Sequence, residues 1–546
     1  MDSFSEKVCK VSNHSKKVLA IVLVVLLSVA CVFAQSIKEV IHGEYQGKTV
    51  ILHSNDVHGA IEGYAKMAAL RDYYVSEGAD VILIDAGDFS QGTMYVNVSK
   101  GYNAVQLMNR VGYDIAGLGN HDFDYSYEQL VSNLATAQFE ILCANIFNET
   151  GNSIYPAFMV GTTDSGLKIG FFAMDTPETQ TKANPVQIKG LQIPTGDKFF
   201  KIAQDCVDAL KAQNVDLIIC IAHLGIDNES KPYTSYELLE RISGIDYLID
   251  GHSHSVFTDY DGLADQQTGT GFVNIGVIVI DEEGKIEDAF LRPTEDLPSD
   301  EDVLSFAQGI INQVDAEYSI KFAESKVDLN GDKAPGNRTM ETNLGDLVAD
   351  SILWSITRDP SSVTVPTDNI VAMTNGGGIR AWLRKGDITK KDINTVQPFG
   401  NTVSVIYVTG KQILEVLEAS TYLTPDAVGG FPQIAGMEIT IDTTKAYEPN
   451  AETYPNSTYY GPASINRVTV NSINGKDFDP DATYAVVTNN FCAAGGDTYY
   501  AFASTTNQFD TGMPLDEILM EYITTVLGGV IDEKYAEPAG RITIIK

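Results

Sequence analysis

Side chains of the kind that bind metal ions follow almost every apolar run in the first half of the chain. In sequence order they are Asp56, His58, Asp88, Asn120, His223, His252 and His254. Four imidazoles, two carboxylates and one amide are too many ligands for one tetrahedral site, so we expect two divalent ions that share a bridging carboxylate. The mixture of imidazole and carboxylate favours Zn, Mn, Co or Fe over Ca, which prefers oxygen ligands alone. Two such ions can clamp the attacking and leaving oxygens of a phosphoryl displacement and supply hydroxide at neutral pH.

Strand ends must position these ligands. Between residues 48 and 290, β-rich runs such as "DVILIDAG" and "LIICIAHLG" alternate with helical stretches. We expect these helices over 63–76, 101–111, 126–137 and 197–213. The alternation predicts a layered α/β domain, and the carboxyl ends of its strands meet in one crevice where ligands bind. Five strand ends therefore bring the predicted ligands together.

The remainder of the chain predicts a linker and a second domain. Segment 291–302 is rich in proline and acidic residues, as is typical of a boundary, and 301–320 is amphipathic and helical. We expect a first domain over 46–297, a helical linker over 298–323 and a second domain over 324–546. The second domain opens with the predicted helix "NLGDLVADSILWSI" and ends in short strands and loops.

The first 34 residues have the pattern of an export signal. Lys16 and Lys17 precede an apolar run, and the small residues typical of a cleavage site follow it. We expect cleavage after Ala34 and a location in the periplasm, in the cell envelope or outside the cell. The alternative is that segment 1–34 is retained as a membrane anchor, and only then do we expect membrane contact.

Charge and cysteine content limit the partners and the redox chemistry. A net charge of −36 repels the phosphates of nucleic-acid polymers, so a phosphate-bearing substrate must be met by bound metals or by a few placed arginines. Four cysteines follow the signal segment, without the CxxC spacing of a zinc or redox motif. They are Cys143, Cys206, Cys220 and Cys492, and their spacing leaves open whether two of them form a disulfide.

Four motifs in the second half carry candidate ligand-binding residues, namely Arg338, Asn375, Arg380, Phe399, Phe491 and Asp497. The three glycines of "TNGGGIR" let the backbone approach a ligand closely, and Arg380 after them can pair with a phosphate or a carboxylate. Phe399 and Phe491 lie in glycine-flanked loops, so we expect them outside the core, where they can stack on a flat ring. Asp497, in a Gly-Gly-Asp turn, can accept hydrogen bonds from two ribose hydroxyls. Ordinary glycine turns with incidental aromatic residues are the alternative.

The motif order D-x-H, GD, GNH, a strand-terminal His and then GH-x-H resembles the calcineurin-like metallophosphoesterase domain. Nearly the whole chain is similar to bacterial periplasmic and animal ecto-5′-nucleotidases. The resemblance implies a four-layer α/β/β/α domain, followed by an α+β nucleotide-binding domain. It implies one metal at Asp56, His58, Asp88 and His254, and a second metal, bridged by Asp88, at Asn120, His223 and His252. His254 departs from the amide often found at its position in the family, which leaves the metal preference of that site open.

The resemblance also assigns roles around the substrate. It implies that Arg338, Asn375 and Arg380 surround the phosphate, that Phe399 and Phe491 stack on the base, and that Asp497 binds the ribose. In "GLGNHDFDYS", Asn120 is then a ligand and His121, next in sequence, points towards the phosphate. Asp124, three residues further on, is placed to hold the imidazole of His121 and to make it more readily protonated. We assign no role to Asp122.

We therefore expect an exported hydrolase with two divalent ions that releases phosphate from nucleoside 5′-monophosphates. Nucleoside di- and triphosphates and UDP-sugars are further candidate substrates. One alternative is a 2′,3′-cyclic-nucleotide 2′-phosphodiesterase with 3′-nucleotidase activity, built on the same two domains. Another is a catalytically silent surface protein that binds nucleotides. Because the chemistry and the substrate pocket fall on different domains, we also expect the domains to rotate against each other during turnover.

Overall fold

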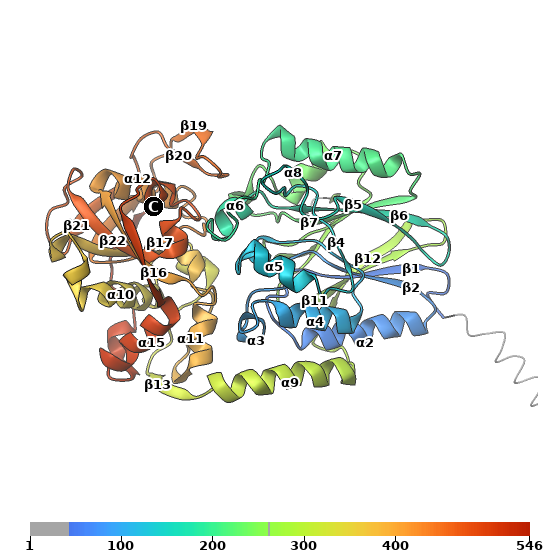
Figure 1. Ribbon diagram of the computed structural model, residues 1–546, viewed down its shortest axis with the longest axis horizontal. Coiled ribbons are helices and arrows are strands. Elements are labelled where there is room, and N and C mark those ends of the chain that lie inside the picture. Colours follow the sequence, from blue (N-terminus) through green and yellow to red (C-terminus); the bar gives the residue numbers. More distant parts are fainter. Residues whose placement is uncertain (1–42, 260–261) are drawn as a thin grey trace, which may run out of the picture.

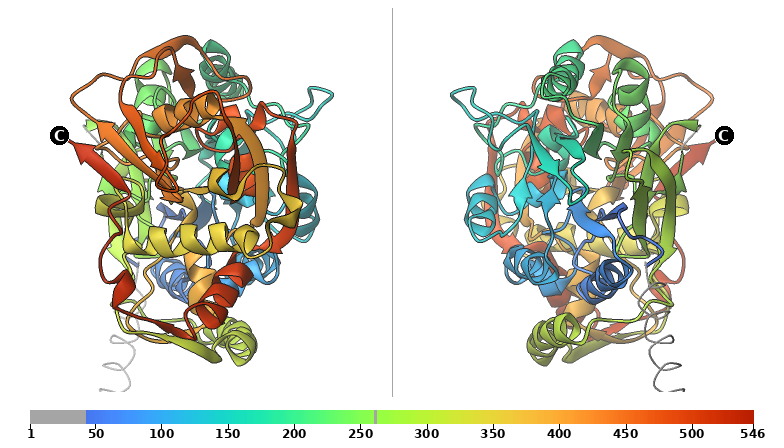
Figure 2. Two further views of the ribbon diagram at one scale, coloured as in Figure 1. Left: turned by 90° about the vertical axis from the view of Figure 1, so that its left-hand side faces the viewer. Right: turned by 90° about the vertical axis from the view of Figure 1, so that its right-hand side faces the viewer.

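The computed structural model describes residues 43–259 and 262–546, so the predicted signal segment 1–34 lies outside the described residues. The described chain forms two lobes that lie side by side, with helix α9 (Glu301–Tyr318) running beneath the first lobe towards the second (Figure 1). The end views show α9 below both lobes (Figure 2). No helix within these residues is long and apolar enough to cross a membrane.

Two six-stranded sheets form the centre of the first lobe. The first has the order β12 (Ile286–Pro293), β11 (Asn274–Ile280), β1 (Thr49–Ser54), β2 (Asp80–Asp85), β3 (Ile115–Ala116) and β4 (Glu140–Ile141). The second has the order β5 (Phe158–Thr162), β6 (Lys168–Asp175), β7 (Leu217–His223), β8 (Tyr247–Ile249), β10 (Asp265–Thr268) and β9 (Val256–Thr258). Strands β1 to β4 pair in parallel, as do β6, β7, β8 and β10, so the carboxyl ends of each set lie at one edge.

Alternate residues of these strands pack on opposite faces, which produces four layers. Ile51 of β1 and Ile219 of β7 belong to the core between the sheets, whereas Leu52 and Cys220, the next residues, face the helices. Figure 1 shows helices above and below the pair of sheets. The helices of this lobe are α2 (Gly63–Ser76), α3 (Met94–Asn97), α4 (Tyr102–Val111), α5 (Tyr127–Leu134), α6 (Thr179–Lys182), α7 (Asp197–Lys211) and α8 (Ser235–Arg241), of which α7 and α8 lie above the sheets and α2 and α4 below them in Figure 1. The predicted α/β/β/α arrangement is confirmed.

Helix α9 packs against the first lobe. The Asp300 side chain accepts a hydrogen bond from the N–H of Val303 and so caps the helix. Its buried residues recur every three or four positions, and three of them, Val303, Ala307 and Ile311, join the core around α2 and α4. The helix falls within the predicted linker 298–323, while the exact domain boundaries stay a prediction.

A five-stranded sheet forms the centre of the second lobe, in the order β17 (Pro432–Ala435), β14 (Ile370–Asn375), β22 (Thr483–Asn489), β16 (Thr402–Thr409) and β23 (Gln508–Pro514). Successive residues of β16 alternate between two cores, one on each face of this sheet. The helices are α10 (Asn343–Thr357), α11 (Lys390–Val396), α12 (Gly410–Ser420), α13 (Asn490–Ala493), α14 (Tyr500–Ala503) and α15 (Leu515–Thr525).

Short strands complete the second lobe. One small sheet contains β15 (Gly386–Thr389), β13 (Lys321–Ser325) and β24 (Val530–Ile531), and another contains β21 (Val468–Ile473), β18 (Met437–Asp442) and β25 (Ile542–Ile545). The hairpin of β19 (Pro449–Thr453) and β20 (Tyr460–Pro462) lies at the upper end of this lobe in Figure 1. The four cysteines of the described residues are buried and free, so no disulfide joins them.

Candidate active site between the lobes

The loops at the carboxyl ends of β1, β2, β3, β7 and β8 bring all seven predicted ligands together. Five of the seven have left-handed backbone, with φ of 48° at Asp56, 45° at His58, 62° at Asp88, 80° at His252 and 58° at His254. Residues other than glycine adopt this conformation only at a cost, which persists where the surrounding fold enforces it, most often at functional sites. The loop shapes are therefore held by the lobe as a whole.

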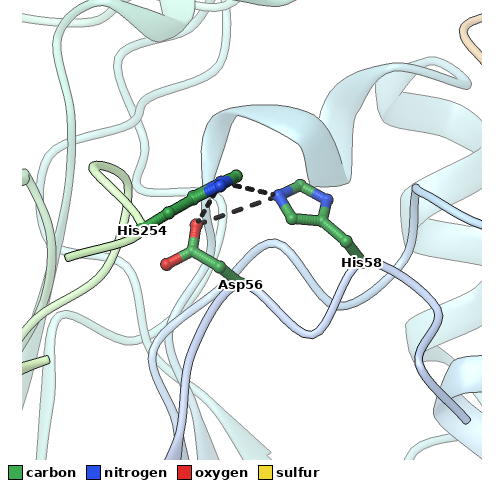
Figure 3. A group of neighbouring side chains, drawn as sticks. All are labelled: Asp56, His58 and His254. Carbon is green, nitrogen blue, oxygen red and sulfur yellow. Dashed lines mark hydrogen bonds and ion pairs between the residues drawn. The ribbon is translucent and has the colours of Figure 1, made fainter. Parts of the chain in front are cut away.

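Two groups of ligand atoms are compact enough to hold a metal ion. One consists of Asp56, His58 and His254, drawn in Figure 3, where His254 Nε2 lies 3.4 Å from Asp56 Oδ1 and 3.2 Å from His58 Nε2. The other consists of Asp56, Asp88 and His223, with His223 Nε2 3.2 Å from Asp88 Oδ2. Asp88 Oδ2 also lies 3.6 Å from His58 Nε2, so this carboxylate stands between the two groups. Asp56, which the resemblance places at one metal only, belongs to both groups.

The hydrogen bonds of the imidazoles leave their lone pairs directed into the site. The backbone carbonyl of Gln91 accepts from His58 Nδ1 at 3.0 Å, and that of Ala86 accepts from His223 Nδ1 at 2.7 Å, so the Nε2 atom of each ring carries a lone pair. His223 Nε2 is buried and has no hydrogen-bond partner among the described residues. Lone pairs that converge beside carboxylates favour a cation, so these residues fit divalent metal ions.

His121 and Asp124 form the expected pair. His121 Nδ1 lies 2.8 Å from Asp124 Oδ2, and the backbone N–H of His121 donates to Asp88 Oδ1 at 2.8 Å. Burial lowers the pKa of His121 to about 3, an effect that Asp88 opposes and Arg380 reinforces. Burial also raises the pKa of Asp124 well above its usual range, and Asp88 adds to the shift. Both pKa shifts favour a neutral pair, in contrast to the readily protonated imidazole that we expected from the spacing.

Asp122, to which the sequence assigned no role, ties the ligand loops together. Its carboxylate accepts hydrogen bonds from the backbone N–H groups of Asp88 at 3.0 Å, Gly119 at 2.9 Å and Ser90 at 3.0 Å. The Ser90 hydroxyl also donates to it, at 2.6 Å. A buried carboxylate with several donors is well satisfied, so Asp122 fixes the loop after β2 against the turn that carries Asn120.

A cavity of about 370 Å³ lies between the lobes and joins the two halves of the predicted site. Its walls include six predicted residues of the second lobe, namely Arg338, Asn375, Arg380, Phe399, Phe491 and Asp497. The Phe399 ring stacks on that of His121, with centroids 5.3 Å apart, and the Arg380 guanidinium lies 5.6 Å from the Phe399 centroid. Burial, and then the nearby Arg338, lower the pKa of Arg380 to about 10, so this group keeps its positive charge at neutral pH. The cavity therefore presents arginines and an aromatic ring beside the predicted metal ligands.

Three second-lobe residues make more contacts with other protein groups than expected. Phe491 is only 7% exposed and packs in a hydrophobic core as well as against the cavity, so the expectation that it lies outside the core is wrong. The amide of Asn375 donates to Asp497 at 2.7 Å and accepts from Asn489 at 3.0 Å. Asp497 also pairs with Lys182 of the first lobe at 3.3 Å. In this arrangement, therefore, protein groups occupy the polar atoms of Asn375 and Asp497.

The sequence analysis missed a polar cluster at the lobe boundary. Glu178, Lys182 and Glu229 of the first lobe and Tyr459 of the second lobe share hydrogen bonds there. A signal for Glu178 was present, because "KIGFFAMD" is an apolar strand followed by "TPE", the same pattern that marks the metal ligands. No comparable signal marks Tyr459, since its partners lie far away in the sequence.

The layered fold and the two groups of ligand atoms define a metallophosphoesterase. The calcineurin-like phosphoesterase model matches residues 49–256 and the model of the 5′-nucleotidase C-terminal domain matches residues 321–504, which together are more than half of the chain. The chain belongs to the 5′-nucleotidase family of nucleotide phosphoesterases and is accordingly a phosphoric monoester hydrolase. This confirms the family that the motif order resembled.

Individual relatives are moderately similar to this chain in sequence. The trifunctional nucleotide phosphoesterase YfkN of Bacillus subtilis is 29% identical over 89% of this chain, which spans only 34% of YfkN. A 5′-nucleotidase of Vibrio cholerae is 26% identical, with 91% of this chain and 93% of that protein covered. The crystal structure of the 5′-nucleotidase precursor from Thermus thermophilus has a TM-score of 0.75 at 26% identity and covers 91% of this chain and 99% of that chain. The family implies divalent metal ions but not which ones.

Proposed function

We propose that the protein is an exported hydrolase that uses two divalent ions, Zn, Mn or Co, to release phosphate from nucleoside 5′-monophosphates. Nucleoside di- and triphosphates and UDP-sugars are further substrates under this proposal. The observation that carries it is the cavity between the lobes, lined both by predicted metal ligands and by arginine, phenylalanine and aspartate of the second lobe. The printed names of the Vibrio and Thermus relatives, both 5′-nucleotidases, also support it.

The proposed metal ligands follow the family pattern. One ion would be held by Asp56, His58, Asp88 and His254, and the other by Asp88, Asn120, His223 and His252. When bound, the ions supply positive charge for the phosphoryl group and acidify the attacking water. The converging lone pairs of the imidazoles support this assignment.

The other residues bind and orient the substrate. Arg338 and Arg380 pair with the phosphate, since a guanidinium can donate two parallel hydrogen bonds to it. His121, held by Asp124, hydrogen-bonds the phosphoryl group during transfer and assists the leaving oxygen. Phe399 and Phe491 stack on the base, and Asn375 and Asp497 face the phosphate and the ribose.

Substrate binding under this proposal requires the lobes to move. The contacts between Lys182 and Asp497 and between His121 and Phe399 cross the lobe boundary and occupy groups that we assign to the nucleotide. A rotation of the second lobe would free them and admit the substrate. Solution scattering with and without a nucleotide analogue tests this, and equal separation of the lobes in both states would count against it.

Phosphate release from AMP by the purified protein tests the function, with Mn²⁺, Zn²⁺ or EDTA, beside 2′,3′-cyclic AMP and UDP-glucose. Release from AMP that depends on metal would support the 5′-nucleotidase activity. Release from the cyclic substrate alone would favour the 2′,3′-cyclic-nucleotide phosphodiesterase. Tight AMP binding without turnover of any substrate would favour the silent binding protein. Export is tested separately, by fractionating cells that express the full chain and sequencing the N-terminus of the product.

A further inference from the structure

We propose that Glu178 is a positioning residue for the predicted ligand His252, and that Tyr459 of the second lobe reaches Glu178, so that docking of the lobes helps to orient a metal ligand. The inference rests on the two-metal site of the proposed function. It adds a residue outside the predicted ligand set and a link from that residue to the second lobe.

Glu178 lies just beyond the carboxyl end of β6, at the start of α6, and is 1% exposed. Its two carboxylate oxygens have different partners. Oε2 lies 2.9 Å from His252 Nε2, and Oε1 lies 3.3 Å from the hydroxyl of Tyr459. A buried carboxylate with one oxygen on a ring nitrogen and the other on a group from a different lobe can connect the two.

The contact with Glu178 determines which nitrogen of His252 faces the metal site. A carboxylate accepts, so Nε2 of His252 carries a proton and Nδ1 is the nitrogen left to bind a metal ion. Nδ1 lies 2.8 Å from the amide oxygen of Asn120, which only accepts, so a proton or a metal ion belongs beside these two atoms. Glu178 therefore holds His252 in the orientation that suits a metal ligand. Carboxylates in this position fix the ring orientation and increase the basicity of the ligand.

The hydroxyl of Tyr459 joins the carboxylates of the first lobe. Tyr459 lies in the turn between β19 and β20 and is 4% exposed. Its hydroxyl lies 2.9 Å from Glu229 Oε1 and 3.3 Å from Glu178 Oε1. Lys182 also contacts Glu229, at 2.5 Å, and its ammonium lies 5.7 Å from the centroid of the Tyr459 ring. Separation of the lobes would remove the Tyr459 hydroxyl while Glu178 and His252 stayed together on the first lobe. Docking therefore places the single hydroxyl proton of Tyr459 between the carboxylate of Glu229 and that of Glu178, the group that orients His252.

The test compares Glu178→Gln and Tyr459→Phe with the unaltered protein. Tyr460→Phe is the matched control, because Tyr460 is the next residue and is 45% exposed. Each protein is equilibrated with Mn²⁺ or Zn²⁺ at graded chelator concentrations, and bound metal is measured by mass spectrometry. AMP hydrolysis is then measured at limiting and at saturating metal, and circular dichroism and thermal unfolding check the fold.

We expect Glu178→Gln to weaken one of the two metal sites by about 10-fold to 100-fold, as is typical for such carboxylates. Tyr459→Phe should weaken the same site by a smaller factor, with activity restored at saturating metal, and Tyr460→Phe should match the unaltered protein. Unchanged affinity at both sites in a folded Glu178→Gln protein would overturn the positioning role. Unchanged affinity in Tyr459→Phe would overturn the link to the second lobe. If Glu178→Gln does not fold, the metal affinity of Tyr459→Phe alone decides whether the inference stands.

The same measurements separate this inference from the proposed function. An unaltered protein that binds two ions and hydrolyses AMP, with variants that behave identically, would overturn only the inference. An unaltered protein that binds no metal would overturn both.

Discussion

The imidazole of His121 and the phenyl ring of Phe399 lie nearly face to face across the lobe boundary, with centroids 5.3 Å apart and planes inclined by 23°. His121 comes from the turn that carries a predicted metal ligand, and Phe399 comes from the loop between α11 and β16. A predicted catalytic residue of one lobe thus touches a predicted base-binding residue of the other. Changes at Phe399 can therefore affect either nucleotide binding or the chemical step, and the two effects can be measured apart.

Replacing Phe399 by leucine should raise KM for AMP by about 5-fold to 100-fold, because a stacked base contributes about 1–3 kcal/mol. Ribose 5-phosphate has no base, so its KM should stay unchanged. Steady-state kinetics with both substrates measure this. A fall in kcat for both substrates, with unchanged KM, would instead mean that the ring acts through His121.

Replacing Asp88 by asparagine should remove bound metal and slow phosphate release from AMP by about a thousand-fold, since bound ions supply several kcal/mol of charge stabilisation. Asparagine tolerates the left-handed backbone at this position, where φ is 62°, so the loop should keep its shape. Metal content and the rate of phosphate release are measured on the same sample. Asp205→Asn, an exposed aspartate of α7, serves as the control and should retain both. Full metal content in Asp88→Asn would contradict the assignment.

His121→Asn should lower kcat for AMP by about 10²-fold to 10⁴-fold, the usual contribution of a placed acid or base. Its metal content should not change, because the contact of residue 121 with Asp88 is made by the backbone N–H. Asp124→Asn should lower kcat less, since it leaves the imidazole in place but weakens its orientation. Loss of metal from His121→Asn at saturating concentrations would indicate that His121 is a ligand.

His53 should make the protein sensitive to acid. Burial lowers its pKa to about 4, while Gln266, 2.6 Å away on β10, raises it slightly. The unfolded chain binds a proton near the ordinary pKa of histidine and the folded chain does not, so this stability is present above about pH 6.5 and is lost as the pH falls towards about 4. We expect a loss of about 2 kcal/mol between about pH 7 and about pH 5.

Urea unfolding of the unaltered protein and of His53→Gln at both pH values measures this contribution. Glutamine can still donate a hydrogen bond to Gln266 but does not titrate. The variant should therefore lose less stability on acidification. An equal loss in both proteins would assign the acid sensitivity to other groups.

Strand periodicity and strand-end chemistry predicted much of the first lobe and its site. The apolar runs became the strands, and all seven predicted ligands follow or end them, because parallel strands present their carboxyl ends on one edge. The spacing of His121 and Asp124 also predicted their contact. These features depend on segments of a few residues, which a sequence displays directly.

Contacts between distant segments could not be predicted in this way. The role of Asp122 depends on where the loop after β2 lies, and the contact of Lys182 with Asp497 depends on how the lobes dock. Phe491 was expected outside the core because glycines flank it, yet the Phe491 ring packs against Gly496 with no room for a Cβ there. Adjacent glycines marked close packing at this position rather than an open loop.

The left-handed backbone at five of the seven predicted ligands limits how this site could be transplanted. Each such residue costs roughly 1–2 kcal/mol, and the cost is borne by the packing of the whole lobe. A designer who copied only the seven side chains onto another α/β protein would obtain loops that relax to ordinary conformations and aim the ligands elsewhere. Glycine at these positions would relieve the strain but remove the ligand. The smallest part of the protein that could carry this site into another fold is therefore the set of strand-to-loop segments together with the two sheets that hold them.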